Sequence, residues 1–439
     1  MSPQRRSRPE HERFRTSIRP RLAALPASPE VVVVGAGAAG IAAARHLSER
    51  GVAVAVLEAR RRVGGRVVTA ELRGHAVDLG AHWLHAGPIN PLVQIGNIRG
   101  EPLRVAAQES HLWVGRRPGR PAEAAAHGRA FAAVDGSMTA RAAQGGEDRP
   151  ASSALPAAGL GPWRERVALV HGLVSGLPLT EVSLHDFPSM EYGDNRFIAG
   201  GYGAFLARLA QGLPIALSAA VTRIAWSGAG VRVETDVGLV LEAKAVIVTA
   251  PMMVLRERPL FAPALPANVW AAIDGFRRGV YEHAVLHWPS SPFRGADRLA
   301  SVVGGRHKPP GLLTRIDGTP FHYFEMDAPT CAALDARRGD ADHARRAVRI
   351  VLAEHFGQRA LKDLSIPVVS AWRHDPWSLG SWAVVPPGRA GARAALRPSV
   401  EDRIWFAGEA LSRLQWGTAG GAYEEGTRAA SEVAASLGR

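Results

Sequence analysis

The pattern of hydrophobic positions begins with a short apolar run that is typical of a buried strand. Val31 to Val34 are four consecutive β-branched residues, as expected for a strand of a parallel sheet that is covered on both faces. An Ala-rich segment from Ala38 to Arg50 predicts a helix that ends at Gly51. Val52 to Leu57 predicts a second strand. The pattern therefore indicates a β-α-β unit and an α/β fold.

Later segments predict further elements. Val221 to Ile224, Val231 to Glu234 and Leu239 to Glu242 form short apolar runs with Gly-containing turns, which predict a β-meander beside the first sheet. From Thr418 we expect a helix that continues to about Leu437. Arg116 to Pro162 is rich in Ala, Gly, Pro and Arg with little hydrophobic periodicity, so we expect loops or loosely packed helices there.

The turn after the first strand carries the glycine pattern of a dinucleotide-binding unit. Gly35 permits a tight turn, Gly37 lets the backbone approach a pyrophosphate, and Gly40 lets the helix pack close to the strand. The amino end of the helix, at Ala38, would present free N-H groups to phosphate. Glu58 follows Gly40 by eighteen residues, near the offset at which an acid hydrogen-bonds a ribose hydroxyl. The complete unit predicts dinucleotide binding rather than an ordinary glycine-rich turn, and it leaves NAD and FAD open.

Length and composition limit the classes of protein. The 439 residues suffice for two to three domain-sized cores, and 46% hydrophobic residues mark a globular chain. The longest apolar run, Val31 to Ala44, belongs to the nucleotide unit, so we expect no membrane span. Cys331 is the single cysteine, which excludes an intrachain disulfide framework and a C-x-x-C redox or zinc site.

The net charge of +13 raises the question of nucleic acid, an acidic membrane surface or acidic substrates as partners. Residues 1–29 hold seven arginines against two glutamates and lack apolar periodicity, so we expect a disordered basic tail. This tail also lacks the apolar region of a secretory signal, and we expect a cytoplasmic protein. We expect no nucleic-acid partner, with contact by the tail as the alternative.

The residues after Glu58 favour FAD. Arg60, Gly64, Gly65 and Arg66 continue the unit as E-A-R-x-R-x-G-G-R, and here the chain resembles the FAD-dependent amine oxidases. That family includes monoamine oxidases, polyamine and spermine oxidases, and lysine-specific histone demethylases. Six later blocks also resemble the family: residues 77–85, 200–210, 220–224, 246–251, 375–382 and 404–422. The weakest resemblance lies between about residues 86 and 190.

The resemblance implies a discontinuous architecture. A Rossmann-like FAD-binding domain would comprise residues 30–85, 196–255 and 372–439, and an α+β substrate-binding domain residues 86–195 and 256–371. FAD would be held by Gly35, Gly37, Ala38, Ala39, Gly40, Glu58, Arg60, Gly64, Gly65, Arg66, Gly80, Ala81, His82, Trp83, Val221, Gly408, Glu409, Gly417, Thr418 and Ala419. Monoamine oxidases tether FAD through a cysteine, but the corresponding place here is near Gly380, so we expect non-covalent FAD. We also expect no C-terminal membrane anchor.

The resemblance also implies catalytic positions. The amino end of the last helix, with free backbone N-H groups at Thr418 to Gly420, would stabilise negative charge on the reduced flavin. An aromatic cage that orients the amine would include Trp382 and, at its second position, Thr418, as in polyamine oxidases and histone demethylases. Trp382 as a core residue is the alternative. His85 would line the substrate entrance, and we expect no metal at His82 and His85 because three-residue spacing needs further ligands.

One position departs from the family. The strand with the family's active-site lysine reads G-V-Y-E-H-A-V-L-H-W-P here, which places His283 at the lysine position. A histidine can hold a water molecule and changes protonation near neutral pH, but it is not a permanent cation. His283 as an ordinary strand residue satisfied by its neighbours is the alternative.

These observations lead to three hypotheses. The first is oxidation of an amine by hydride transfer to FAD, giving an imine, then an aldehyde, with oxygen reduced to hydrogen peroxide. The second is a dehydrogenase or desaturase of the same fold with another electron acceptor or a non-amine substrate. The third is a flavin-binding protein without turnover. The sequence leaves open the oligomeric state. It also leaves open whether the amine substrate is a polyamine or a hydrophobic monoamine. Acidic residues that could attract a cationic amine are Glu191, Asp194, Glu282, Glu325 and Asp327.

Overall fold

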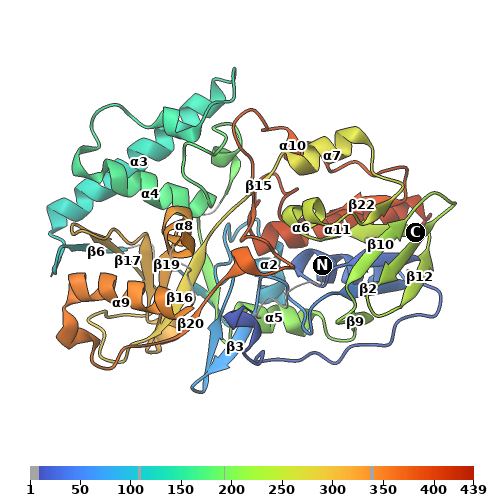
Figure 1. Cartoon of the computed structure of the whole chain (residues 1–439), viewed down its shortest axis with the longest axis horizontal. Coiled ribbons are helices and arrows are strands. Elements are labelled where there is room, and N and C mark those ends of the chain that lie inside the picture. The colour runs from blue at the N-terminus through green and yellow to red at the C-terminus, as the bar shows by residue number, and fades with distance from the viewer. Residues whose placement is uncertain (1–8, 107–109, 192, 337–340) are drawn as a thin grey trace.

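The protein consists of two parts that lie side by side, each built around its own sheet (Figure 1). A computed structural model describes residues 9–106, 110–191, 193–336 and 341–439. The first part contains a five-stranded parallel sheet, in the order β22-β13-β1-β2-β9. Its strands are β1 (Val31–Val34), β2 (Val54–Glu58), β9 (Ile215–Leu217), β13 (Ala245–Val248) and β22 (Ile404–Phe406).

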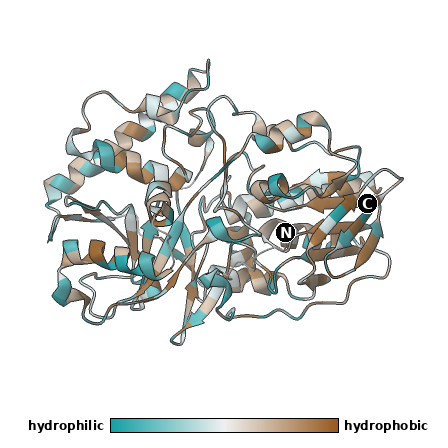
Figure 2. Ribbon diagram, viewed as in Figure 1, coloured by the Kyte–Doolittle hydropathy of each residue, from teal (hydrophilic) through white to brown (hydrophobic). Residues whose placement is uncertain are grey.

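Strand β1 is buried because both faces of this sheet are covered. Val31 and Val33 pack with helices α1 (Ala38–Glu49), α5 (Tyr202–Leu209) and α11 (Ala419–Ser436). Val32 and Val34 face the other side and pack with a four-stranded sheet and two helices. These elements are β10 (Val221–Ala225), β11 (Val231–Thr235), β12 (Val240–Ala243), β14 (Phe261–Ala262), α6 (Met252–Glu257) and α7 (Ala267–Asp274). The alternation explains why an unbroken apolar run is needed here, and Figure 2 shows many hydrophobic residues in this half.

The second part contains a seven-stranded mixed sheet in the order β20-β16-β19-β18-β17-β6-β7. Its strands are β6 (Ser110–Val114), β7 (Arg117–Pro118), β16 (Glu282–His287), β17 (Arg298–Val303), β18 (Gly311–Thr314), β19 (Phe321–Met326) and β20 (Ser365–Val369). Ala284 and Leu286 pack on one face with helices α8 (Ala328–Ala336) and α9 (Ala341–Phe356). Val285 points to the other face, where it packs with the hairpin β3 (Thr69–Leu72) and β4 (His75–Asp78).

Further helices and short strands lie outside these sheets. Helices α3 (Pro121–Ala143) and α4 (Arg164–Ser175) belong to a separate small core. The remaining elements are α2 (Pro91–Ile98), α10 (Ala392–Ala395), and the pairs β5 (Leu103–Val105) with β8 (Arg196–Ile198) and β15 (Arg277–Arg278) with β21 (Ala383–Val384). None of the helices in the described ranges is long and apolar enough to cross a bilayer.

The predicted elements of the nucleotide unit are present. The first strand spans the expected residues, the helix ends one residue earlier than expected, and the strand predicted from Val52 begins at Val54. The three strands of the meander and the last helix are confirmed, with shifts of one residue at their ends.

One expectation left two alternatives open and another was wrong. The stretch from Arg116, where we expected loops or loosely packed helices, contains a 23-residue helix, α3, whose buried residues His127, Ala130, Val134 and Met138 form one narrow stripe. Four positions in 23 residues are too few to give a clear periodicity. Residues 260–276, expected in the substrate-binding part, pack instead with the sheet of the first part, because β14 extends the meander beside β10.

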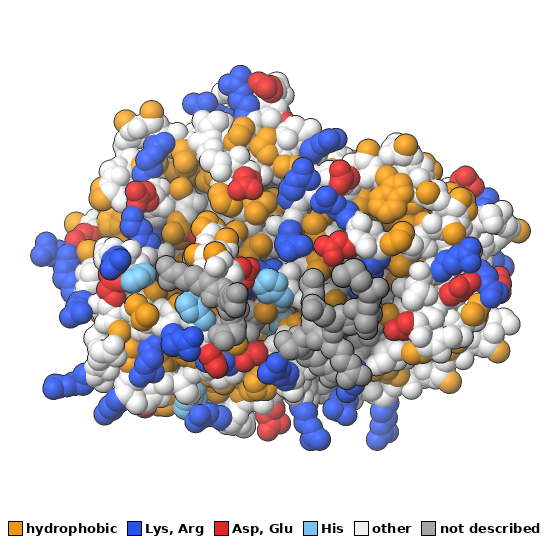
Figure 3. All heavy atoms as spheres, in the orientation of Figure 1, with side chains coloured by type: hydrophobic (Ala, Val, Ile, Leu, Met, Phe, Trp, Pro, Cys, Tyr) orange, Lys and Arg blue, Asp and Glu red, His pale blue; other side chains and the backbone are white. Residues whose placement is uncertain are grey.

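The N-terminal segment also differs from the expected disordered tail. Residues 9–29 lie against the body of the protein and include a short 3-10 helix, Glu10–Glu12, with His11 buried. Charge pairs of Glu10 and Glu12 and scattered apolar contacts of Phe14, Ile18 and Leu22 hold this segment without a regular apolar period, which explains the wrong prediction. Residues 1–8 lie outside the described ranges. On the face in Figure 3, Lys and Arg side chains lie mainly along the margins, with Asp and Glu interspersed.

Candidate active site

A cavity of about 590 Å³ lies between the two parts and is lined by residues of both. One end is formed by the loops at the carboxyl edge of the parallel sheet, where open α/β sheets bind ligands. The other end is formed by β16, β19 and helices α3 and α4.

The glycine turn after β1 forms one wall of the cavity. Gly35 has a φ of +103°, which favours glycine, and Gly37 is the N-cap of α1. A Cβ atom on Gly37 would meet no protein atom within 4 Å, and Gly37 lines the cavity. The backbone is therefore open to a ligand at the amino end of α1, as a pyrophosphate requires.

Gly40 does not line the cavity, unlike the other predicted cofactor residues. A Cβ atom there would lie 1.8 Å from the carbonyl oxygen of Gly35. Gly40 thus permits the close packing of α1 on β1 predicted for it, and its effect on a ligand is indirect.

Glu58 lies at the end of β2 and is buried at the cavity wall. Its carboxylate accepts hydrogen bonds from the backbone N-H groups of Ala36 at 2.7 Å and Arg60 at 2.8 Å. These bonds hold the carboxylate beside the glycine turn, in the position expected for an acid that binds a ribose hydroxyl.

The two arginines of the extended motif connect distant loops at the cavity. Arg60 donates to the carboxylate of Asp375 at 2.6 Å and to the hydroxyl of Ser378 at 2.8 Å. Arg66 donates to the carbonyl oxygen of Ser381 at 2.7 Å and to Glu409 at 3.1 Å. The motif around residue 60 is thus tied to the 375–382 and 404–422 blocks.

The remaining predicted cofactor residues also line the cavity: Ala38, Ala39, Gly64, Gly65, Gly80, Ala81, His82, Trp83, Val221, Gly408, Glu409, Gly417, Thr418 and Ala419. Thr418 is the N-cap of α11, and its hydroxyl accepts from Gly421 N and donates to Gln415 O. Its oxygen therefore caps the helix. The open glycine turn, the buried acid and two helix amino ends fit a flavin dinucleotide.

Trp382 lies at the substrate end, and the backbone of three glycines packs closely against its indole ring. Added Cβ atoms at Gly176, Gly279 and Gly417 would lie 2.7, 3.0 and 3.3 Å from atoms of its indole ring. Its indole N-H donates to the carbonyl oxygen of Ser175 at 2.9 Å. Tyr281 faces it with ring centroids 5.7 Å apart. Both rings line the cavity, and Trp382 also packs against the small core of α3 and α4.

His283 lies on β16 and is buried against aromatic rings at the same end. Its ring centroid lies 5.6 Å from that of His82 and 4.6 Å from that of Tyr323. Neither ring nitrogen has a hydrogen-bond partner of good geometry among the described residues, although the carbonyl group of Asp78 lies near the ring, and His283 lines the cavity. Burial, with the neighbouring His82, lowers the pKa of His283 well below its usual value although the carbonyl group of Asp78 opposes this. The ring is neutral near pH 7.

The two other histidines of this region have separate partners. His82 Nδ1 donates to the carbonyl oxygen of Gly80 at 3.0 Å, and burial lowers the pKa of His82 to about 4. His85 lines the cavity, and its Nδ1 lies 2.9 Å from Oδ1 of Asn195.

Sequence reasoning missed the pair formed by Tyr281 and Glu325. Among the five suggested acids, only Glu325 lines the cavity within the described part of the chain. It pairs across strands with His283 and accepts from the Tyr281 hydroxyl at 3.3 Å. Burial raises the pKa of Glu325 to about 7, against the opposite effects of Arg166 and Tyr281. The sequence offered one signal for this pair, an acidic residue within the mainly aromatic segment 321–326.

Comparison with known proteins supports the assignment of this cavity. A family model described as flavin containing amine oxidoreductase matches residues 38–434. Polyamine oxidase 4 of Oryza sativa subsp. japonica is 30% identical over 92% of this chain and 88% of its own length. Lysine-specific histone demethylase 1B of Mus musculus is 28% identical over 92% of this chain and 53% of its own length.

The solved structures agree at the level of the fold. Wild-type putrescine oxidase bound to putrescine superimposes with a TM-score of 0.77 at 20% identity, covering 94% of this chain and 100% of that one. The chain spans about half the length of the demethylases that it matches. The family model covers most of the chain and includes both ends of the cavity, and the chain therefore belongs to the flavin containing amine oxidoreductases, with FAD as its cofactor.

Proposed function

We propose that the protein oxidises an amine with FAD as the electron acceptor. Bound FAD would accept the hydride of the amine α-carbon. Water would hydrolyse the resulting imine to an aldehyde and release the nitrogen as ammonia or a smaller amine. Oxygen would take up the two electrons with two protons to give hydrogen peroxide. The observation that carries the proposal is a single cavity that joins the nucleotide turn at Gly37 to the aromatic and acidic pocket at Trp382 and Glu325.

Trp382 and Tyr281 orient the amine. Their tilted rings form an apolar surface with electron-rich faces, on which an amine can be placed with one C-H bond directed to the cofactor. The glycines around Trp382 leave the indole little freedom to move. Positioning of this kind contributes strongly to catalysis, because the reacting atoms are held together before the reaction.

Glu325 gives the pocket its preference for a positively charged group. With a pKa of about 7, this carboxyl group carries part of its negative charge at neutral pH. A cation that enters the pocket stabilises the charged form. We therefore propose a substrate with a second amino group, such as a diamine or polyamine, in preference to a hydrophobic monoamine.

His283 contributes a neutral imidazole beside the reacting end. Its unpaired nitrogens can hold the water molecule that hydrolyses the imine, in the place of the family's lysine. A neutral ring provides no fixed positive charge for the reaction with oxygen. This difference favours, as a second candidate, a dehydrogenase or desaturase that passes its electrons to another acceptor.

Anaerobic mixing of the FAD-loaded protein with diamines, polyamines and aromatic monoamines tests the proposal. We expect diamines or polyamines to bleach the oxidised flavin band, and air to restore it with one peroxide formed per turnover. Bleaching without peroxide would select the dehydrogenase, whereas a flavin that no amine reduces would contradict amine oxidation and leave a desaturase or a protein without turnover.

A further inference from the structure

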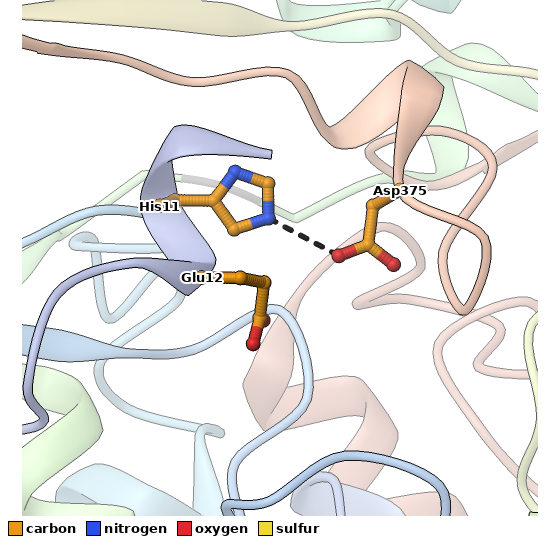
Figure 4. Close-up of side chains that lie close together, drawn as sticks. All are labelled: His11, Glu12 and Asp375. Atoms are coloured by element: carbon orange, nitrogen blue, oxygen red, sulfur yellow. Dashed lines mark hydrogen bonds and ion pairs between the residues drawn. The ribbon is translucent and has the colours of Figure 1, made fainter. Parts of the chain in front are cut away.

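The N-terminal segment reaches the wall of the cofactor cavity, although it precedes the residues matched by the family model. His11 has a fully buried side chain. Its ring stacks on Trp372, with centroids 3.8 Å apart and an angle of 26° between the planes. Its Nε2 donates to Oδ2 of Asp375 at 3.2 Å, as Figure 4 shows. Trp372 itself lines the cavity.

The same segment forms ion pairs with both parts of the protein. Glu12 lies 3.2 Å from Nε of Arg60 and also pairs with Arg62, both in the first part. Glu10 pairs with Arg345 of α9 at 2.7 Å and accepts from the backbone N-H of Val369 at 3.0 Å, both in the second part. Residues 10–12 therefore bridge the two parts beside the cavity.

Asp375 is the link between His11 and the cofactor wall. One of its carboxylate oxygens accepts from His11 and the other from Arg60. Although burial alone would raise it, the pKa of Asp375 is held at about 2, chiefly by Arg60 and by His11. The carboxylate is thus charged under ordinary conditions, and the position of Arg60 depends on how Asp375 is held.

The cluster has the geometry of a metal site but the charge balance of an ion network. Single ligand atoms of His11, Glu12 and Asp375 lie within 4.8 Å of one another. Arg60 and Arg62 donate to these carboxylates, so two guanidinium groups already balance the two negative charges. A metal ion would have to displace them, which disfavours metal binding.

We propose that His11 is a positioning residue for FAD, which sets Arg60 at the cavity wall through Asp375 and sets Trp372 there by stacking on it. The proposal rests on the assignment of the cavity to FAD. Without His11, Asp375 keeps Arg60 and the backbone N-H of Trp377 as partners, but it loses the hydrogen bond to the second carboxylate oxygen. Trp372 loses its stacking ring. Arg60 and Trp372 are then held by fewer contacts, and the cofactor must order them further when it binds.

The test compares His11→Ala, which removes both interactions, with His11→Phe, which keeps the ring and removes the hydrogen bond. Arg15→Ala is the control, because Arg15 is an exposed cation of the same segment. FAD affinity is measured by titrating each apoprotein and following flavin fluorescence. We expect about tenfold weaker binding for His11→Ala, a smaller loss for His11→Phe, and a change of less than about twofold for Arg15→Ala.

Thermal unfolding of the apoprotein and of the FAD-loaded protein separates positioning from general stability. The proposal requires a smaller gain in Tm on adding FAD for His11→Ala than for the wild type. Equal FAD affinity in the wild type and both His11 variants would overturn it, even if both variants unfold at lower temperature. A rise in wild-type Tm with Zn²⁺ that His11→Ala lacks would also overturn it in favour of a metal site. A wild type that binds no FAD would instead contradict the cofactor assignment.

Discussion

The two ends of the cavity are built in different ways. The wall at the amino end of α1 consists mainly of backbone groups from one stretch, the turn from Gly35 to Ala39, together with Glu58. The substrate end consists of side chains from strands and loops far apart in the sequence, such as Tyr281, Glu325 and Trp382. Backbone recognition needs a fixed spacing of small residues, whereas side-chain recognition needs only that distant residues meet in space. Backbone recognition therefore leaves a recognisable pattern in the sequence, whereas side-chain recognition does not.

The largest loss of stability should come from a substitution of Gly40 at the cofactor end, because protein atoms fill the space beside this residue. Gly40→Val places side-chain atoms on the carbonyl oxygen of Gly35, so α1 must move away from β1. We expect a loss of about 3 kcal/mol or more in the free energy of unfolding, measured by urea denaturation of the apoprotein. Gly128→Ala in α3 is the control, since its added methyl group meets no atom within 4 Å. A Gly40→Val protein of wild-type stability would contradict the packing described here.

Gly37 should respond in the opposite way, because its neighbour is the cofactor rather than the protein. Gly37→Val meets no protein atom within 4 Å of its Cβ, so the apoprotein should keep its stability to within about 0.5 kcal/mol. FAD binding should weaken by about a hundredfold or more, because the new side chain occupies the place of the pyrophosphate. Equilibrium dialysis with FAD measures this. Unchanged affinity would show that the dinucleotide takes another path through the cavity.

The pair of glycine variants also shows how much of the site the sequence could predict. The spacing of Gly35, Gly37, Gly40 and Glu58 reports local geometry, so their positions follow from residue type alone. The pairing of His283 with Glu325 depends on the register of β16 and β19, which the sequence does not reveal.

Other features were hidden for different physical reasons. Helix α3 buries a stripe of only four side chains, so its pattern is weak. His11 is buried against the ring of Trp372 and the carboxylate of Asp375, which lie more than three hundred residues further along the chain. No local sequence pattern could predict these contacts.

At the substrate end, Glu325→Gln keeps the shape of the pocket and removes its charge. We expect kcat/KM for a diamine to fall by about thirtyfold, since a charged hydrogen bond is lost, and to change little for an aromatic monoamine. Because the pKa of Glu325 is raised to about 7, its carboxyl group is neutral below that pH and charged above it. KM for the diamine should therefore fall as pH rises through 7 in the wild type and lose this inflection in the variant. Glu191→Gln is the control, because Glu191 is an exposed acid whose side chain does not line the cavity.

The smallest effect concerns His283. His283→Lys introduces a cation beside the reacting end, and we expect reoxidation by oxygen to become about tenfold faster, equal to about 1.4 kcal/mol of the barrier. The rate of flavin reduction by the amine should change by less than about threefold. Stopped-flow absorbance measures both steps, and His287→Lys on the same strand is the control. Equal reoxidation rates in all three proteins would remove His283 as the reason for any slow reaction with oxygen.

The order of strands in the parallel sheet has a consequence for how the protein is made. Strand β1 lies next to β2 and β13, and β13 pairs in turn with β22, which starts at Ile404. Helix α1 packs on α11 so closely that a Cβ atom on Gly426 would lie 2.1 Å from the carbonyl oxygen of Ala39. A nascent chain on the ribosome therefore carries its glycine turn for most of translation without the elements that complete it. We therefore expect FAD to bind after synthesis is complete, when α11 has packed on α1.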